Sequence, residues 1–188
     1  MNYSSVLDFW FGPPAERPYR AREFWFRKSD AVDAEIRTRF GPTIEAAMAN
    51  RLEPWSTSPD GTRALILVLD QFTRNAFRDS PRSFAGDAAA LAHARRMIDA
   101  GLDRRCEPVE RWFIYMPFEH SESLADQHES LRLFRGLAAD GLQGPIEWAQ
   151  KHFDVIQRFG RFPHRNEILG RPSSADEIAF LQQPGARF

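Results

Sequence analysis

Two short segments of this 188-residue chain are apolar on every side if they are helical, and they constrain the fold most. They are A-L-I-L-V-L at Ala64–Leu69 and W-F-I-Y-M at Trp112–Met116. A helix without a polar face lies inside a protein, where other elements cover it. The sequence therefore predicts that both segments lie in the interior of a helical protein.

The rest of the chain also has a helical pattern. Apolar residues recur at intervals of three and four positions between glycine and proline breaks, with no clear two-residue alternation and no Asn-Gly hairpin. Hydrophobic residues make up 43% of the chain, which is enough for a core of its own. We expect an all-α fold: one domain over residues 1–188, built as an array or bundle of about eight or nine helices.

Glycine and proline indicate where the helices end. Gly41-Pro42 is expected to interrupt the helix that opens at Asp30, and Pro117 to kink or end the second apolar helix. Gly160 suits the left-handed C-terminal cap of a helix that begins near Pro145. Short connectors at these points would join the helices.

Charge and composition exclude several classes of protein. The formal net charge is −1, so no global field attracts nucleic acid or a membrane. No segment approaches about 18 unbroken apolar residues, and the N-terminus lacks the basic region of a signal peptide. One cysteine, Cys106, rules out an intramolecular disulfide. We expect a cytoplasmic protein with neither nucleic acid nor membrane as partner.

Polar clusters follow both apolar segments. D-Q-F-T-R-N occupies Asp70–Asn75 and E-H-S-E occupies Glu119–Glu122, while a third cluster, R-F-G-R-F-P-H-R-N at Arg158–Asn166, follows a helix end. Charged groups at the end of a buried helix must pair with each other, reach solvent or line a pocket, because desolvation without a partner is costly. The clusters are therefore either one site or a set of structural ion pairs.

Each cluster supplies candidate residues. Asp70 and Arg74 are four positions apart on one helix face, so they can form an ion pair. That pair is either a structural salt bridge at the helix end or a means for Asp70 to hold Arg74 rigid so that the arginine binds an anion. His120 can act as general acid or base, with Glu119 or Glu122 orienting it. The candidate catalytic residues are His120 and His164, and the candidate ligand-binding residues are Asp70, Arg74, Asn75, Glu122, Arg158, Arg161, Arg165 and Asn166.

Two of these clusters also have a structural interpretation. Ser121 or Ser123 fits the start of the following helix as its cap, with Glu122 as an acid in the first turn. In the third cluster Pro163 fixes a turn, which suits a rigid binding loop and a tight structural corner equally well. Its arginines would attract an anionic partner.

A metal site has no sequence support. The chain contains neither H-x-x-x-H nor H-E-x-x-H spacing, so a site built from His120, His152, His164 and Asp70 would depend wholly on folding. We assign no metal ligand, and the cofactor is unknown. His93 and His128 lie on amphipathic helices and are expected at the surface.

An ordered series of motifs resembles a known bacterial family. The motifs are L-D-F-W-F-G, F-W-F-R-K-S, L-D-Q-F-T-R-N-A-F-R, Y-M-P-F-E-H-S-E and R-F-G-R-F-P-H-R-N-E-I-L-G-R-P-S-S. Together, from about Val6 to Leu181, they resemble the family called domain of unknown function 924. Thr73 stands where proline is usual, and Pro172-Ser173-Ser174 varies the common E-S-T. The resemblance implies an all-helical fold related to tetratricopeptide superhelices, and no established activity.

Three functional hypotheses remain, and whether the chain is an enzyme is left open. The first is a site for a small anionic ligand that bears carboxylate or phosphate, where His120 or His164 would move a proton in a hydrolysis. The second is a helical module for a peptide, a protein partner or a second copy, with a groove lined by Trp10, Trp25 or Trp148. In the third, the polar motifs form a structural salt-bridge network.

Overall fold

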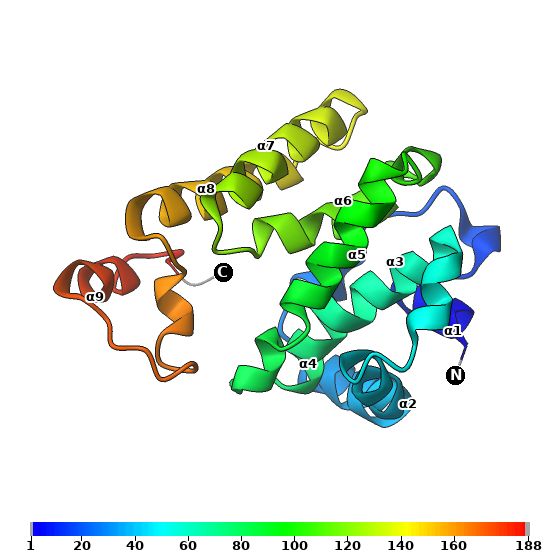
Figure 1. The fold of residues 1–188 in the computed structure, drawn as a ribbon, viewed down its shortest axis with the longest axis horizontal. Helices are drawn as coiled ribbons and strands as arrows, with labels where there is room; N and C mark the ends of the chain where they lie inside the picture. The colour runs from blue at the N-terminus through cyan, green and yellow to red at the C-terminus, as the bar shows by residue number, and fades with distance from the viewer. Residues whose placement is uncertain (1, 187–188) are drawn as a thin grey trace.

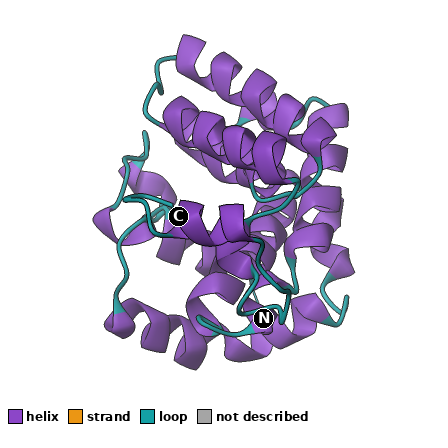
Figure 2. Cartoon of the chain, turned by 90° about the vertical axis from the view of Figure 1, so that its left-hand side faces the viewer, coloured by secondary structure: helices purple, strands orange, loops and turns teal. Residues whose placement is uncertain are grey.

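The computed structural model describes residues 2–186, and it is helical throughout that range (Figure 1). Loops and turns join the helices, and residues 2–186 contain no strand (Figure 2). The α-helices are α1 Tyr3–Trp10, α2 Asp30–Met48, α3 Pro59–Leu67, α4 Thr73–Ala76, α5 Asp87–Asp99, α6 Pro108–Glu119, α7 Leu124–Ala139, α8 Pro145–Phe159 and α9 Ala175–Leu181. The predicted all-α array of about eight or nine helices is confirmed.

The first apolar segment lies at the centre of the molecule. Helix α3 passes through a π-helical turn, Val68–Phe72, directly into α4. Every residue of Ala64–Leu69 is at most 2% exposed, as predicted. The turn carries the chain from an apolar interior to the polar cluster without a break, so the side chains of that cluster begin inside the protein.

The second apolar segment is buried except at its first residue. Phe113 is 2% and Ile114 1% exposed, whereas Trp112 is only half-buried. Aromatic rings from the N-terminal region pack on this helix: the ring centroid of Trp25 lies 4.8 Å from that of Phe113, and that of Trp10 lies 5.4 Å away. These contacts hold the short 3-10 helix Glu23–Trp25 against α6.

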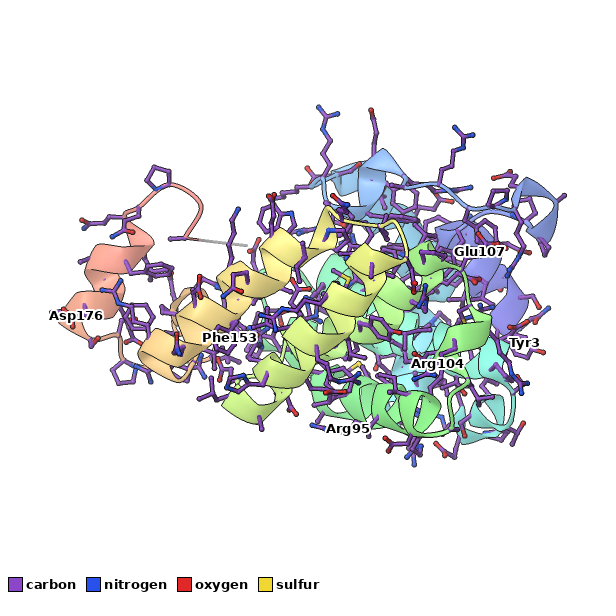
Figure 3. The ribbon with its side chains drawn as sticks, turned by 90° about the horizontal axis from the view of Figure 1, so that it is seen from above. Tyr3, Arg95, Arg104, Glu107, Phe153 and Asp176 are labelled. Carbon is purple, nitrogen blue, oxygen red and sulfur yellow. The ribbon has the colours of Figure 1, made fainter. Side chains whose placement is uncertain are left out.

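Helices α7 and α8 lie side by side, and α9 lies at one end of the molecule (Figure 1). Figure 3 shows Asp176 of α9 at this end and Tyr3 of α1 at the opposite end. A small cluster of Val155, Ile156 and Phe162 attaches this end, with Phe180 of α9 packed against it. It is separate from the main core, which draws on α1 to α8.

The two predicted proline breaks have different outcomes. Helix α2 continues through Gly41-Pro42 without interruption, which corrects the expected break. Proline removes one helical hydrogen bond and crowds the preceding turn, but Phe40 and Ile44 on either side are both core residues whose packing keeps the helix in place. Helix α6 also contains Pro117 and ends two residues later, at Glu119, so the proline lies near the helix end without being the point where the helix stops. Gly160 caps α8 with a left-handed φ of 68°.

His93, expected at the surface, is 4% exposed, because α5 packs against both α3 and α6.

Within residues 2–186, no helix has both the length and the apolar character needed to cross a membrane.

Candidate functional site

A cavity of about 500 Å³ lies where the three polar clusters meet. The clusters come from α4 and the π-helical turn, from the end of α6, and from the corner after α8. Their side chains that line the cavity are Gln71, Arg74 and Asn75 from the first cluster, Glu119 and His120 from the second, and His164 and Arg165 from the third. Segments far apart in the sequence therefore share one cavity.

Aromatic residues form the apolar part of the cavity wall. Trp25, Phe26, Trp112 and Trp148 all line it. The rings of Phe26 and Trp112 are stacked with centroids 4.6 Å apart. Phe26 is 55% exposed and Trp148 47% exposed, so the wall continues to the protein surface. The cavity thus combines an apolar wall with a polar floor, as small-molecule sites commonly do.

Asp70 holds His120 from behind the cavity. Its side chain is 1% exposed, and its Oδ1 lies 2.7 Å from Nδ1 of His120, while Nε2 of Gln71 donates to Oδ2 at 2.6 Å. Burial would raise the pKa of Asp70, but His120 and Arg74 beside it hold the pKa well below its usual range. Asp70 is therefore an ionised acceptor, which fixes the imidazole proton of His120 on Nδ1.

His120 itself is kept uncharged. Its burial and the charge of Arg74 lower its pKa, and Asp70 offsets this only in part. With the proton on Nδ1, Nε2 is the nitrogen that can accept a proton. A neutral imidazole oriented by a buried carboxylate is the arrangement of a general base.

Arg74 is held by two carboxylates. Its Nη1 lies 3.3 Å from Oδ1 of Asp70, the predicted ion pair, and it also binds Asp87 with both terminal nitrogens at 2.9 and 3.0 Å. Asp87 begins α5 and is not among the predicted site residues, because an acid in a first helical turn is ordinary. Gly86 allows this approach, since a Cβ there would lie 2.1 Å from the carbonyl oxygen of Leu69.

Arg165 is a buried cation whose charge and hydrogen-bond donors are only partly satisfied by the protein. Its side chain is 8% exposed, and Nη2 donates to the carbonyl oxygen of His120 at 3.0 Å. Nη1 lies a longer 3.3 Å from Asp87, and Nε is buried with no hydrogen-bond acceptor within residues 2–186. Burial and repulsion from Arg74 lower the pKa of Arg165 to about 10, so the group stays charged at neutral pH in an unfavourable environment.

Glu119 and His152 form a second carboxylate–imidazole contact, which the sequence analysis did not assign. Oε1 of Glu119 lies 2.9 Å from Nδ1 of His152, and this nitrogen is also 2.9 Å from the carbonyl oxygen of Trp148. Both neighbours accept hydrogen bonds, so Nδ1 carries the proton. Glu119 is 2% exposed, and its Oε2 is buried without a hydrogen-bond partner among the described residues.

His164 is the third imidazole of the cavity, and it is also uncharged at neutral pH. Burial, the charge of Arg165 and the neighbouring His152, His120 and Arg74 together lower its pKa to about 3. Its ring centroid is 5.6 Å from that of Phe162. His164 is the second of the two residues expected to carry protons, and it shares the cavity with the first.

Besides Asp70, which lies behind the wall, four expected ligand-binding residues do not line the cavity, and two of them, Glu122 and Arg161, hold the C-terminal segment. Glu122 accepts the backbone N–H of Phe162 at 2.8 Å and pairs with Arg171 at 2.7 and 2.9 Å. Arg161 pairs with Glu177 at the start of α9, at 2.6 and 2.8 Å. Helix α7 begins at Leu124 with Ser123 at its N-cap position, so Glu122 precedes the helix and does not lie in its first turn as expected.

The remaining two of these four residues face away from the cavity. Asn166 is fully buried, donates to Ser173 at 3.0 Å and accepts from Arg171 at 3.0 Å. Arg158 is exposed, with its guanidinium over Phe159. The third cluster turns a corner at the 3-10 helix Pro163–Arg165, so only His164 and Arg165 face the cavity.

The same residues do not form a metal centre. In the described part of the chain, no group of three or more His, Cys, Asp or Glu side chains is arranged to hold a metal ion. Ser121 is also engaged elsewhere, since its hydroxyl donates to Asp126 at 2.7 Å.

Comparison with known proteins places the chain in a family. Residues 6–185 match the model of a family described as bacterial protein of unknown function (DUF924). A solved structure, described as a protein of unknown function from Agrobacterium tumefaciens, is 35% identical, covers 96% of each chain and superposes with a TM-score of 0.84. The curated proteins give no match. The chain belongs to the bacterial DUF924 family.

Proposed function

We propose that the protein binds a small anionic molecule in the cavity, with the anionic group at Arg165. The observation that carries this proposal is a buried guanidinium at the meeting point of three separate polar clusters, with its Nε unbonded within residues 2–186. A buried polar group without a partner is costly, and a bound acceptor would remove that cost. An anion would also offset the repulsion that lowers the pKa of Arg165.

The charges around the cavity favour a carboxylate over a phosphate dianion. Five cationic and two acidic side chains line it. Carboxylates behind the wall already pair with Arg74 and with Arg78, the latter through Asp33 at 2.8 Å. Arg165 shares Asp87 with Arg74, so these two cations lack about one negative charge, which a bound monoanion would supply. The bidentate geometry of a guanidinium suits a single carboxylate.

The Asp70–His120 pair supports a hydrolytic reaction on such a molecule. His120 is uncharged, carries its proton on the nitrogen that faces Asp70 and lines the cavity. In this proposal Nε2 of His120 accepts a proton from a water molecule as that water attacks the bound substrate, and the imidazolium returns this proton to the leaving oxygen or nitrogen as the bond to it breaks. Asp70 stabilises the imidazolium that forms.

A binding measurement on matched arginine variants tests the proposal. Isothermal titration with 3-phenylpropionate is compared for wild type, Arg165→Gln and Arg158→Gln, below the melting temperature of each protein. We expect the exposed Arg158→Gln variant to bind as the wild type does and Arg165→Gln to lose at least ten-fold in affinity. Equal binding by all three proteins, or no binding by the wild type, would refute the site.

A second candidate function is a module that binds a peptide or protein partner, as the resemblance to tetratricopeptide-like folds suggests by analogy alone. One observation favours it: Phe26 and Trp148 are half exposed beside the cavity. Trp10 is 1% exposed and belongs to the core, so it cannot line a groove. A peptide partner or a second copy would bind more weakly to Trp148→Ala, while the binding of 3-phenylpropionate would still depend on Arg165.

A further inference from the structure

We propose that the ligand is a zwitterion of the amino-acid type, and that Glu119 binds its ammonium group while Arg165 binds its carboxylate. This inference rests on the proposed anion site at Arg165 and adds a second charge of opposite sign. It also assigns the apolar wall to the body of the ligand.

Glu119 offers an acceptor that the protein itself leaves unused. One carboxylate oxygen lies against His152, while Oε2 is buried and has no hydrogen-bond donor within residues 2–186. The side chain is 2% exposed and lines the cavity. A buried carboxylate oxygen without a donor is costly, so a donor group on a ligand would be bound strongly there.

The position of Glu119 on its helix favours a cationic donor. It is the last residue of the 12-residue helix α6, whose C-terminal end carries partial negative charge. Asp70, on the other side of His120, is an ionised carboxylate as well. Both effects stabilise a positive charge beside Glu119 more than they stabilise a neutral hydroxyl group.

The Arg165 side chain contacts the backbone directly beside Glu119. Nη2 of Arg165 donates to the carbonyl oxygen of His120, the residue directly after Glu119. The cationic and the acidic side chain are therefore anchored at neighbouring backbone positions and line the same cavity. In this proposal a molecule whose ammonium and carboxylate groups lie a few bonds apart contacts both side chains.

The aromatic wall accounts for the rest of such a molecule. Trp25 and the stacked pair of Phe26 and Trp112 line the same cavity as the polar side chains. An apolar or aromatic side chain of the ligand would lie against these rings. We therefore infer an amino acid with an aromatic or bulky apolar side chain, or a derivative that keeps both charged groups.

The experiment compares ligands that differ by one charge. Isothermal titration is carried out with L-phenylalanine, with 3-phenylpropionate, which lacks the ammonium group, and with N-acetyl-L-phenylalanine, which lacks its charge. For the wild type we expect L-phenylalanine to bind at least ten-fold more tightly than either of the other two. The affinities of 3-phenylpropionate and N-acetyl-L-phenylalanine, which have no ammonium charge, measure the contribution of the Arg165 site alone.

Variants of two glutamates complete the test. Glu119→Gln should bring L-phenylalanine within about two-fold of 3-phenylpropionate, while Glu147→Gln, at an exposed position of α8, should behave as the wild type. If the wild type binds all three compounds equally and through Arg165, the ammonium site is wrong and the anion site stands. If no compound binds, or if binding is independent of Arg165, both are wrong. The comparison of ligands on the wild type decides the question even where Glu119→Gln does not fold.

Discussion

Oδ1 of Asp70 and Nδ1 of His120 lie 2.7 Å apart, although the two residues are 50 positions apart in the sequence. The contact joins the π-helical turn after α3 to the residue that caps α6. It does two things at once: it ties together the ends of the two most buried helices, and it fixes the tautomer of an imidazole that lines the cavity. Stability and the protonation of this imidazole therefore depend on the same carboxylate.

Replacing that carboxylate by an amide should lower stability. We expect Asp70→Asn to reduce the free energy of unfolding at pH 7 by about 1–3 kcal/mol, because a buried charged acceptor is lost and Arg74 keeps only Asp87. Urea unfolding measures the change. Asp154→Asn, an exposed position on α8, is the control and should change stability by less than about 0.5 kcal/mol.

The effect of this substitution should also depend on pH. The pKa of Asp70 is lowered in the folded protein, so its contribution is complete above the unfolded value of about 4 and decreases as the pH falls below it. The difference between wild type and Asp70→Asn should therefore shrink on acidification below about pH 4. A difference that is constant from pH 7 to pH 3 would contradict the assignment of an ionised Asp70.

His164 should lower the stability of the protein as the pH falls from 6.5 to about 3, a range that begins at a higher pH than that of Asp70. Its pKa is lowered from 6.5 to about 3 on folding, so between these values the unfolded chain binds more protons than the folded protein. Stability must then fall as the pH falls through this window, by up to about 1.4 kcal/mol per pH unit for one group. His164→Gln should flatten that dependence.

Nuclear magnetic resonance can follow the same group directly. The ring proton signals of His164 should show no titration from pH 8 down to about pH 4 in the ligand-free protein. A midpoint near 6.5 would contradict the buried, cation-rich environment. Binding of a carboxylate beside Arg165 should raise the midpoint, because the bound anion offsets the repulsion from Arg165.

Gly86 should tolerate no side chain. A Cβ at this position would lie 2.1 Å from the carbonyl oxygen of Leu69, so Gly86→Ala must move the start of α5 away from the π-helical turn. We expect a loss of about 1–3 kcal/mol from this overpacking. The shift would also separate Asp87 from Arg74 and Arg165, so the affinity for carboxylates should change as well.

Gly136→Ala is the matched control for this substitution. Gly136 is exposed within α7, and a Cβ there would meet no heavy atom of the described residues within 4 Å. Alanine is the better helix former by roughly 0.5–1 kcal/mol, so this variant should be slightly more stable than the wild type. A Gly86→Ala variant as stable as Gly136→Ala would show that the helix start is not in close contact with Leu69.

The helices and their interior segments could be predicted because they depend on local pattern. The apolar run of Ala64–Leu69 is buried as its composition requires, and Gly160 adopts the left-handed cap conformation that its position suggested. The unbroken helix through Pro42 could not be predicted, since it depends on core contacts made by Phe40 and Ile44. Tertiary packing there outweighs a local breaker.

The contacts between the site residues were harder to predict than which residues belong to the site. Asp87 has the appearance of an ordinary first-turn acid, and only the close approach permitted by Gly86 brings it to Arg74. The third cluster divides at its corner, so that Arg165 faces the cavity and Arg161 pairs with α9. Which side of a turn a residue occupies is set by backbone geometry, and spacing along the sequence does not encode it.

Tryptophan fluorescence should report occupation of the cavity. Trp25, Trp112 and Trp148 line it, whereas Trp10 is in the core and Trp55 packs against Tyr3 with ring centroids 5.9 Å apart. Binding of L-phenylalanine or 3-phenylpropionate would replace water against the indole rings and should shift the emission of the protein to shorter wavelength. Trp112→Phe should reduce this shift markedly, because Trp112 lies within the aromatic wall.

Trp55→Phe is the control, since it removes one indole of equal size away from the cavity. It should lower total emission and leave the ligand-induced shift unchanged. An equal shift in Trp112→Phe and Trp55→Phe would place the bound molecule elsewhere. Loss of the shift in Trp112→Phe with retained binding by titration would locate the ligand body against the aromatic wall, as the geometry of Phe26 and Trp112 requires.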